Sequence, residues 1–180
     1  MVIFINISSR NQAKISAGSV VCSEAEVIGD VTIGTRTIVH PKAKILALSG
    51  PIIIGDSNLI EEQVEIINDI PDHKLVIGDN NVFEVGAKCK AMEVGNSNVF
   101  ESKSFVGPNI KVSNGCTIGA HCSLDITENL KENFVIYGED HKRRFASDKP
   151  QAQALQIDFL AKMLPNYHHI MKICKPPSTV

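Results

Sequence analysis

The sequence predicts an all-β fold, a parallel β-helix of six to seven coils, followed by a C-terminal α-helix. Large aliphatic or aromatic residues recur at every sixth position through most of the chain. A Gly often follows directly, and a small residue often stands four positions further on. A period of six fits neither an α-helix nor a single strand. It is the period of a hexapeptide repeat, with one short strand and one turn in each unit.

The repeat has twenty positions, and seventeen of them are Ile, Val or Leu. Three hexads make one coil of about eighteen residues, so the positions stack into three columns, one for each face of a prism. The first column is Ile15, Ile33, Ile54, Ile77, Val94, Val112 and Leu130. The second is Val21, Val39, Ile60, Phe83, Phe100, Ile118 and Ile136. The third is Val27, Ile45, Ile66, Cys89, Val106 and Leu124. We expect these side chains to fill the narrow interior.

Glycine is frequent directly after a repeat position, at Gly34, Gly55, Gly78, Gly95, Gly107 and Gly119. We expect these residues to permit the unusual backbone angles of tight turns. The combined pattern resembles the left-handed parallel β-helix of hexapeptide-repeat proteins. The left hand is implied by that resemblance, because the general rule for parallel crossovers would predict a right-handed connection.

Interruptions of the repeat divide the chain into five expected segments. Residues 1–14 form an N-terminal cap, 15–138 the left-handed β-helix, 139–149 a basic connector, 150–173 a C-terminal helical segment, and 174–180 a disordered tail. Three extra residues near Gly50 and five between Ile66 and Ile77 break the spacing inside the β-helix. The second insertion is expected to form a protruding surface loop.

Three near-identical segments, 54–61, 77–84 and 94–101, place equivalent polar residues above one another. The first polar column is Asn58, Asn81 and Asn98, where we expect structural turns, because Asn tolerates left-handed geometry and its amide can hydrogen-bond along a ladder. The second is Glu61, Glu84 and Glu101. Like charges one strand apart repel. Two interpretations therefore stay open for the glutamates: a solvated face, or a site for a basic surface of a partner.

Beyond the repeat, the spacing becomes helical. The apolar positions are Ala152, Leu155, Phe159, Leu160 and Met163, with polar residues between them. Pro150 suits a first helical turn, and Pro165 is expected to end the helix. A further helical turn is expected through Tyr167, Ile170 and Ile173. The helix should fold back onto one flank of the β-helix, where Leu155, Phe159 and Met163 could seal the core or join a partner interface.

Composition narrows the function. The 180 residues have a net charge of -2, so nucleic acid is not expected as the main partner. No uninterrupted apolar stretch approaches the length of a membrane span, so direct membrane insertion is not expected either. The N-terminal seven residues lack the basic start of a signal peptide. The five cysteines suit buried positions in a reduced compartment.

Two chemistries are known for hexapeptide β-helices, and both are alternatives here. One is acyl transfer with a His base between subunits of a homotrimer. The other is metal-dependent hydration, as in gamma-class carbonic anhydrases, which segments 27–34 and 115–119 resemble. That resemblance places the three metal ligands at Leu46, Pro108 and either Ser113 or Asn114, none of which is His. His40 and His121 lie on separate coils, and no spacing requires a catalytic arrangement. We therefore expect no catalytic residues, no metal and no cofactor.

Several segments closely resemble a narrower family, that of dynactin subunit 6. They are residues 29–45, 50–62, 81–86, 98–103, 155–160 and 164–169. The Ile-Glu-Glu run at 60–62 and the Leu-Pro-Asn-Tyr-His-His run at 164–169 are the most specific of these. The sequence departs from the family in a short loop at 68–75 and in a short tail with no Ser/Thr-Pro after Pro177.

The resemblance implies a non-enzymatic subunit of dynactin, the activator of cytoplasmic dynein. Its implied partner is dynactin subunit 5, another left-handed β-helix, within the pointed-end complex that supports recruitment of cargo adaptors. The implied location is the cytoplasm, on microtubule-associated motor complexes. Candidate partner-binding residues are Glu61, Glu84, Glu101, Leu155, Phe159 and Met163.

Overall fold

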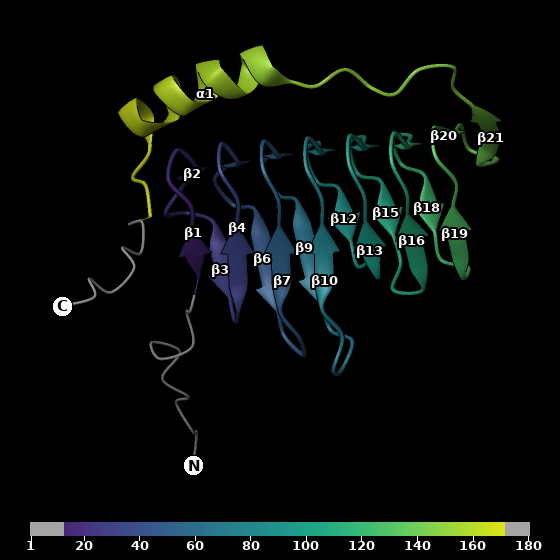
Figure 1. The fold of residues 1–180 in the computed structure, drawn as a ribbon, viewed down its shortest axis with the longest axis horizontal. Helices are drawn as coiled ribbons and strands as arrows, with labels where there is room; N and C mark the ends of the chain where they lie inside the picture. The colour runs from purple at the N-terminus through teal and green to yellow at the C-terminus, as the bar shows by residue number, and fades with distance from the viewer. Residues whose placement is uncertain (1–12, 172–180) are drawn as a thin grey trace.

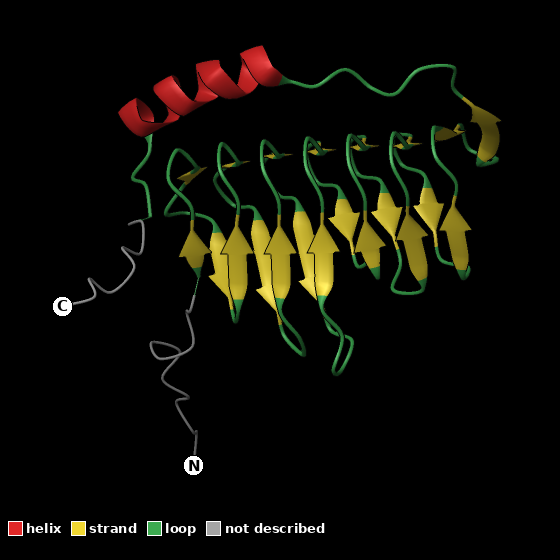
Figure 2. Cartoon of the chain, viewed as in Figure 1, coloured by secondary structure: helices red, strands yellow, loops and turns green. Residues whose placement is uncertain are grey.

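The computed structural model describes residues 13–171, which form a left-handed parallel β-helix of about seven coils with one helix lying along it (Figure 1). Strands and turns alternate along the stack, and the helix lies over one face at the N-terminal end (Figure 2). The fold class expected from the hexapeptide repeat is confirmed. The expected tail at 174–180 and most of the expected N-terminal cap lie outside the described residues.

Three sheets form the faces of the prism. Sheet 1 contains β1 (Lys14–Ile15), β4 (Val31–Ile33), β7 (Ile52–Ile54), β10 (Leu75–Ile77), β13 (Glu93–Val94), β16 (Ile110–Val112) and β19 (Glu128–Leu130). Sheet 2 contains β2 (Val20–Val21), β5 (Ile38–Val39), β8 (Leu59–Ile60), β11 (Val82–Phe83), β14 (Val99–Phe100), β17 (Thr117–Ile118), β20 (Phe134–Tyr137) and β21 (Lys142–Phe145). Sheet 3 contains β3 (Glu26–Ile28), β6 (Lys44–Ala47), β9 (Glu65–Asn68), β12 (Lys88–Cys89), β15 (Phe105–Val106) and β18 (Ser123–Leu124).

The strand register confirms all three predicted columns. In sheet 1, Ile33 pairs with Ile54, which pairs with Ile77. The other two columns show the same one-to-one alignment from end to end. Every repeat position is buried. Each large side chain removed from water contributes about 1.5–3 kcal/mol, so these columns supply the main drive for folding.

Two aromatic residues replace aliphatic ones in the middle of the second column. The rings of Phe83 and Phe100 are stacked with centroids 4.4 Å apart and planes 9° from parallel. Both residues are fully buried. The strand spacing of about 4.8 Å brings equivalent side chains to stacking distance, so a ring can follow a ring without disturbing the register.

The glycines that follow repeat positions have a different role from the one expected. Gly55 and Gly78 do not have a positive φ; the left-handed residues of these turns are Ser57 and Asn80. Instead, a Cβ at Gly55 would lie 2.8 Å from the carbonyl oxygen of Gly78 in the next coil. Glycine is therefore required because adjacent coils approach closely, and not because the turn needs a left-handed angle there.

The asparagine column forms the expected hydrogen-bond ladder inside the corner between sheets 1 and 2. The side-chain oxygen of Asn58 accepts from the backbone N–H of Asn81 at 2.8 Å, and that of Asn81 accepts from Asn98 at 2.9 Å. Asn98 continues the ladder to the N–H of Cys116 at 2.7 Å. The three asparagines are fully buried. Buried polar groups require such partners, and the ladder gives one backbone N–H in each successive turn its acceptor.

Sheet 2 is covered at both ends by the C-terminal segment. Strand β21, which contains the basic run at 142–144, pairs antiparallel with β20. At the other end, Ile170 forms an antiparallel bridge with Cys22, and the N–H of Met171 donates to Val21 O at 2.8 Å. The predicted helical turn through Ile170 is therefore wrong, because this stretch is extended against the free edge of β2. Such pairing protects exposed strand edges from other chains.

Helix α1 spans Ala154–Tyr167, within the predicted segment 150–173 but shorter than it. Pro150 precedes the helix, and Pro165 lies inside its last turn instead of ending it. A proline so close to the C-terminus removes one intrahelical hydrogen bond. His168 N still donates to Leu164 O at 2.8 Å, and the Asn166 side chain donates to Lys162 O at 3.1 Å. These bonds maintain the final turn. Among residues 13–171, no helix has the length and hydrophobicity needed to cross a membrane.

Candidate partner-binding site

The glutamate column lies at the corner that follows sheet 2, where each carboxylate caps a turn of the next coil. Oε2 of Glu61 accepts from the N–H of Val85 at 3.1 Å. Oε2 of Glu84 accepts from the N–H and the hydroxyl of Ser102 at 2.9 and 3.0 Å. Oε2 of Glu101 accepts from the N–H of Ala120 at 2.8 Å. The sequence pattern does not predict this structural role, because it depends on the stacking of consecutive turns.

Capping leaves each of these glutamates half-buried, with one oxygen used inside the fold. Burial raises the pKa of Glu61, and the neighbouring carboxylates of Glu84 and Glu62 add to the rise, against the Val85 hydrogen bond and His40. Within residues 13–171, Oε1 of the three glutamates has no hydrogen-bond partner. The column can therefore accept hydrogen bonds from an approaching partner while it continues to cap its own turns.

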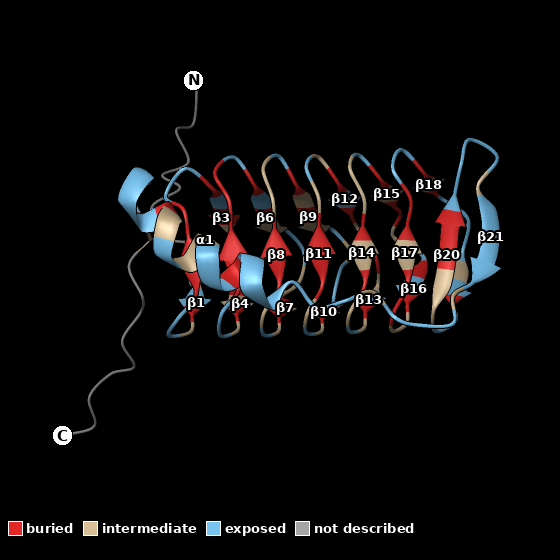
Figure 3. Cartoon of the chain, turned by 90° about the horizontal axis from the view of Figure 1, so that it is seen from above, coloured by how far each residue is buried: buried red, intermediate tan, exposed pale blue. Residues whose placement is uncertain are grey.

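The helix packs on sheet 2 through a face that does not include Leu155 or Phe159, so these two residues do not seal the core. Its packed residues are Ile157, Leu160, Ala161 and Leu164, which lie over Val20, Ile38 and Leu59 on the outer side of sheet 2. Leu155 is 87% exposed and Phe159 is 60% exposed, whereas Met163 is partly buried. Figure 3 shows the helix over the first strands of sheet 2, with its exposed side turned away from the β-helix. Tyr167, which the sequence analysis did not select, extends this apolar side and is 74% exposed.

Polar contacts hold the helix in this position. Asp158 pairs with Arg36 of the second coil at 2.6 Å, and His168 pairs with Glu24 of the first coil at 3.0 Å. The N–H of Ser23 donates to His169 O at 2.7 Å. The outward side chains of α1 are thus presented on a helix that is attached to the β-helix from Ile157 onwards. The two sets of candidate residues lie on different surfaces: the glutamates at the corner in coils three to five, and the helix residues above the first strands of sheet 2.

One corner of the first coils brings together Cys22, His40 and Glu62, which the sequence analysis did not connect. Nδ1 of His40 lies 2.8 Å from Oε1 of Glu62, while its Nε2 is buried without a partner among the described residues. Cys22 is fully buried. Burial, together with the charges of Glu24 and Glu62, raises the pKa of the Cys22 thiol to about 11. A nucleophilic cysteine needs a lowered pKa and an accessible sulfur, so this corner has the wrong properties for covalent catalysis.

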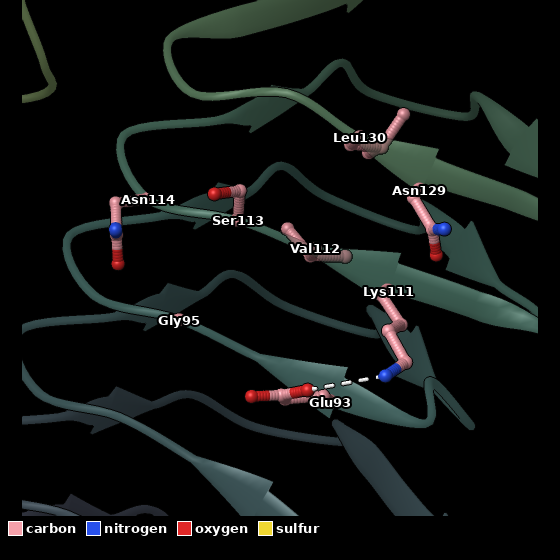
Figure 4. A pocket seen from close by; sticks show the side chains of 8 residues that line it. All are labelled: Glu93, Gly95, Lys111, Val112, Ser113, Asn114, Asn129 and Leu130. Carbon is pink, nitrogen blue, oxygen red and sulfur yellow. Dashed lines mark ion pairs between the residues drawn. The ribbon is translucent and has the colours of Figure 1, made fainter.

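The positions that correspond to metal ligands of the gamma-class carbonic anhydrases lie on or next to sheets 1 and 3. Ser113 and Asn114 border a shallow groove on sheet 1, beside the Glu93–Lys111 ion pair (Figure 4). The side chain of Asn114 accepts from Asn96 N and donates to Glu132, both at 2.8 Å. Leu46 lies on β6, and Pro108 follows β15. Across residues 13–171, no three His, Cys, Asp or Glu side chains are grouped to hold a metal ion.

Comparison with solved structures supports the fold. The chain is similar to a hexapeptide transferase family protein from Anaplasma phagocytophilum, with a TM-score of 0.67 and 19% identity over 86% of this chain and 88% of that chain. It is also similar to a protein from Bacillus cereus described as an acetyltransferase, with a TM-score of 0.53 and 16% identity over 83% and 86% of the two chains. At these identities the likeness concerns the β-helix alone.

Comparison with characterised sequences is more specific. No protein-family profile matches the chain. Dynactin subunit 6 of Xenopus tropicalis is 54% identical over 92% of this chain and 88% of its own. That of Danio rerio is 49% identical over 96% and 94%, and that of Dictyostelium discoideum 33% identical over 86% and 85%. Identity of this extent covers the β-helix and α1 together. The chain therefore belongs to the dynactin subunit 6 family.

Proposed function

We propose that this chain is a non-enzymatic structural subunit of dynactin and binds dynactin subunit 5 directly in the pointed-end complex. Its place would be the cytoplasm, on the microtubule-associated motor complex that dynactin forms with dynein, where the pointed end supports recruitment of cargo adaptors. Membership of the dynactin subunit 6 family supports a role as a dynactin subunit. The partner, the contact surface and the lack of catalysis go beyond that membership and rest on the arguments below.

The main support is the outward face of α1. Leu155 and Phe159 remain exposed although the opposite side of the helix is packed and Asp158 is paired with Arg36. Exposed apolar side chains on an element that is already packed are typical of protein interfaces, because the backbone needs no further ordering on binding. With Tyr167 and the partly buried Met163, they form an apolar surface along the helix. This surface is suited to a partner that lies along the β-helix.

The glutamate column contributes a charged border to the proposed interface. The three carboxylates retain one oxygen each for a partner, and their shared negative charge disfavours pairing of two copies through the same corner. A basic side of the partner would be favoured there. The raised pKa of the Cys22 thiol and the hydrogen bonds of Asn114 support a role without catalysis.

The test is multi-angle light scattering of the chain alone and mixed with dynactin subunit 5. We expect a one-to-one complex and no stable homotrimer. Replacing Leu155 and Phe159 together by Ser should weaken the complex at least about tenfold. Gln151 and Gln156 are exposed polar residues of the same segment. Replacing both of them by Ser should leave the affinity of the complex unchanged. A stable homotrimer that does not bind dynactin subunit 5 would reject the proposal. It would favour an acyltransferase or a metal-dependent hydratase, because both kinds of enzyme form their active sites between identical subunits.

The role of the glutamates needs a substitution that preserves the turn caps. Gln at positions 61, 84 and 101 keeps an oxygen that can accept from Val85, Ser102 and Ala120, whereas Lys would remove the caps. If the column borders the interface, the triple Gln variant should bind more weakly and lose part of the salt dependence of binding. If affinity and salt dependence stay as in the wild type, the column has no part in the interface. In a separate experiment, affinity capture from cells with mass spectrometry would identify the adaptors and cargo that the complex contacts.

A further inference from the structure

A second charged surface lies on the outer side of sheet 3, away from α1 and beside the corner that contains the glutamate column. We propose that it binds an extended acidic segment of another protein through Lys42, Lys44, Lys88 and Lys103. These lysines line a shallow hollow of about 400 Å³ together with a single carboxylate, Glu65. Four positive charges and one negative charge give the hollow a net charge of +3, on a chain whose overall charge is -2. This separation of charge favours a negatively charged partner.

The lysines are available for such a partner. Glu65 lies 3.1 Å from Lys88 Nζ and 3.8 Å from Lys44 Nζ, so one carboxylate is shared by two ammonium groups. Within residues 13–171, Lys42 and Lys103 have no carboxylate within salt-bridge distance. The side chains of Lys44 and Lys88 are 46% and 55% exposed. Binding an anionic segment would therefore require little rearrangement of existing ion pairs.

The floor of the hollow is open because Gly86 contributes no side chain there. Gly86 has a φ of +71, and a Cβ at this position would lie 3.3 Å from Cγ of Lys103. Any larger side chain would narrow the space between Lys88 and Lys103. The open floor allows the backbone of a bound segment to approach the coil surface, with its side chains directed towards the lysines.

The spacing of the lysines fits an extended peptide better than a single small anion. Lys42 and Lys103 occupy equivalent positions three coils apart, which corresponds to about 14 Å at the spacing of adjacent strands. About four residues of extended peptide cover that distance. Lysine is a point charge on a flexible stem and does not impose the bidentate geometry by which Arg recognises phosphate. Several successive carboxylates are therefore the best match.

Neighbouring residues limit the width of the ligand. Each residue of the glutamate column lies two residues before a turn residue that lines the hollow. Glu101, for example, precedes Lys103 by two residues. A membrane surface or an RNA would overlie both rows and be repelled by the carboxylates, whereas one extended chain can follow the lysines alone. Phe105 pairs in register with Lys88 on the side towards the C-terminal coils. We infer that the acidic segment has an apolar residue at the end that lies beside Phe105.

The full chain is titrated into a fluorescein-labelled peptide of about ten residues, alternating Glu and Ser and ending in Phe, at about 50 mM salt. Fluorescence anisotropy follows binding. We expect saturable binding that weakens at least about tenfold when Lys42, Lys44, Lys88 and Lys103 become Gln. The matched control changes Lys14, Lys74, Lys111 and Lys131 to Gln, which alters net charge equally and should change affinity less than about twofold. Circular dichroism and melting curves confirm that both variants fold.

Three results would overturn the proposal. The first is no binding of the peptide by the wild-type chain, or equal losses in the two variants, which would indicate non-specific attraction. The second is tighter binding of phosphatidylserine vesicles or single-stranded RNA than of the peptide by the wild-type chain, lost when Lys42, Lys44, Lys88 and Lys103 become Gln, which would assign the lysines to those ligands. The third is a dimer of the wild-type chain, without peptide, that does not form when the four lysines are replaced by Gln. That result would make a second copy of the chain the occupant of the hollow. The titration uses the chain alone, without dynactin subunit 5.

Discussion

Nδ1 of the buried His40 lies 2.8 Å from Oε1 of Glu62, across two adjacent coils of the β-helix. Burial acts to raise the pKa of Glu62, but the hydrogen bond to His40 and other interactions outweigh it, so the pKa is below its ordinary 4.5. A carboxyl group with a lowered folded-state pKa stabilises the fold above its ordinary pKa, and that stability is lost as the pH falls through the folded-state value. The pair therefore links the stability of the first coils to pH.

The first prediction concerns this pair. Glu62→Gln should lower the free energy of unfolding by about 1 kcal/mol or less at neutral pH, because Glu62 is partly exposed and its charge is screened. The difference from the wild type should be kept down to the ordinary pKa of 4.5 and shrink in the acidic range below it, where the carboxylate becomes protonated. Urea unfolding across this range measures the effect, with Glu139→Gln in an exposed turn as the control. A difference that stays constant with pH would show that the charge of Glu62 is not involved.

The second prediction concerns the opposite end of the pH scale. Burial raises the pKa of Cys22 to about 11 and that of Cys89 to about 12, from an ordinary value of 9.0. Their contribution to stability is fully present below pH 9 and is lost as the pH rises through the folded-state values, because the unfolded chain releases these protons first. Urea unfolding between pH 7.5 and pH 10 should therefore show falling stability. Cys89→Val, which restores the residue type found at Val106, should make the fall shallower.

The third prediction concerns the interior columns. Ile118 is fully buried, so Ile118→Asp should prevent folding, because an unpaired charge would enter an interior without water. Ile118→Val should cost about 1 kcal/mol and remain measurable by melting curves. Lys111→Gln, on the outer side of sheet 1, should change stability by less than about 0.5 kcal/mol. Equal stability of the Asp and Gln variants would contradict the column assignment.

The fourth prediction concerns the turn caps. Glu101→Ala should lower the free energy of unfolding by about 1 kcal/mol, because the N–H of Ala120 loses its acceptor. Glu101→Gln should cost less, since its amide oxygen can replace the carboxylate. Chemical denaturation of the three proteins gives the comparison. If the Gln and Ala variants are equally unstable, the charge of Glu101 matters more than the hydrogen bond.

The fifth prediction separates the two faces of α1. Ile157 is 2% exposed and Leu155 is 87% exposed. Ile157→Ala should weaken attachment of the helix by about 2 kcal/mol or more and speed hydrogen exchange throughout α1. Leu155→Ala should leave exchange almost unchanged, as expected for a surface substitution. The reverse order would mean that Leu155 supports the fold and is not available to a partner.

The sequence alone determined the architecture of the β-helix in detail. All twenty repeat positions stand in the strand register that the period of six predicted, and the asparagine ladder lies where stacking placed it. This success has a physical reason. Each coil of a solenoid contacts only its neighbours, so a short-range pattern in the sequence contains almost all the information that sets the packing. The lysines of sheet 3 could have been found in the same way, by following the corner columns as well as the interior ones.

Tertiary structure alone decided how the corners and the C-terminal segment are used. The closeness of adjacent coils, and not the turn angle, explains Gly55, and the turn of the next coil gives Glu84 its role as a cap. Helix α1 has apolar residues on two sides, and local spacing does not distinguish between them. The choice depends on contacts such as Arg36 with Asp158, 122 residues apart in the chain. Such contacts join segments whose sequence patterns are independent, so only the folded chain determines which side of α1 packs and which remains exposed.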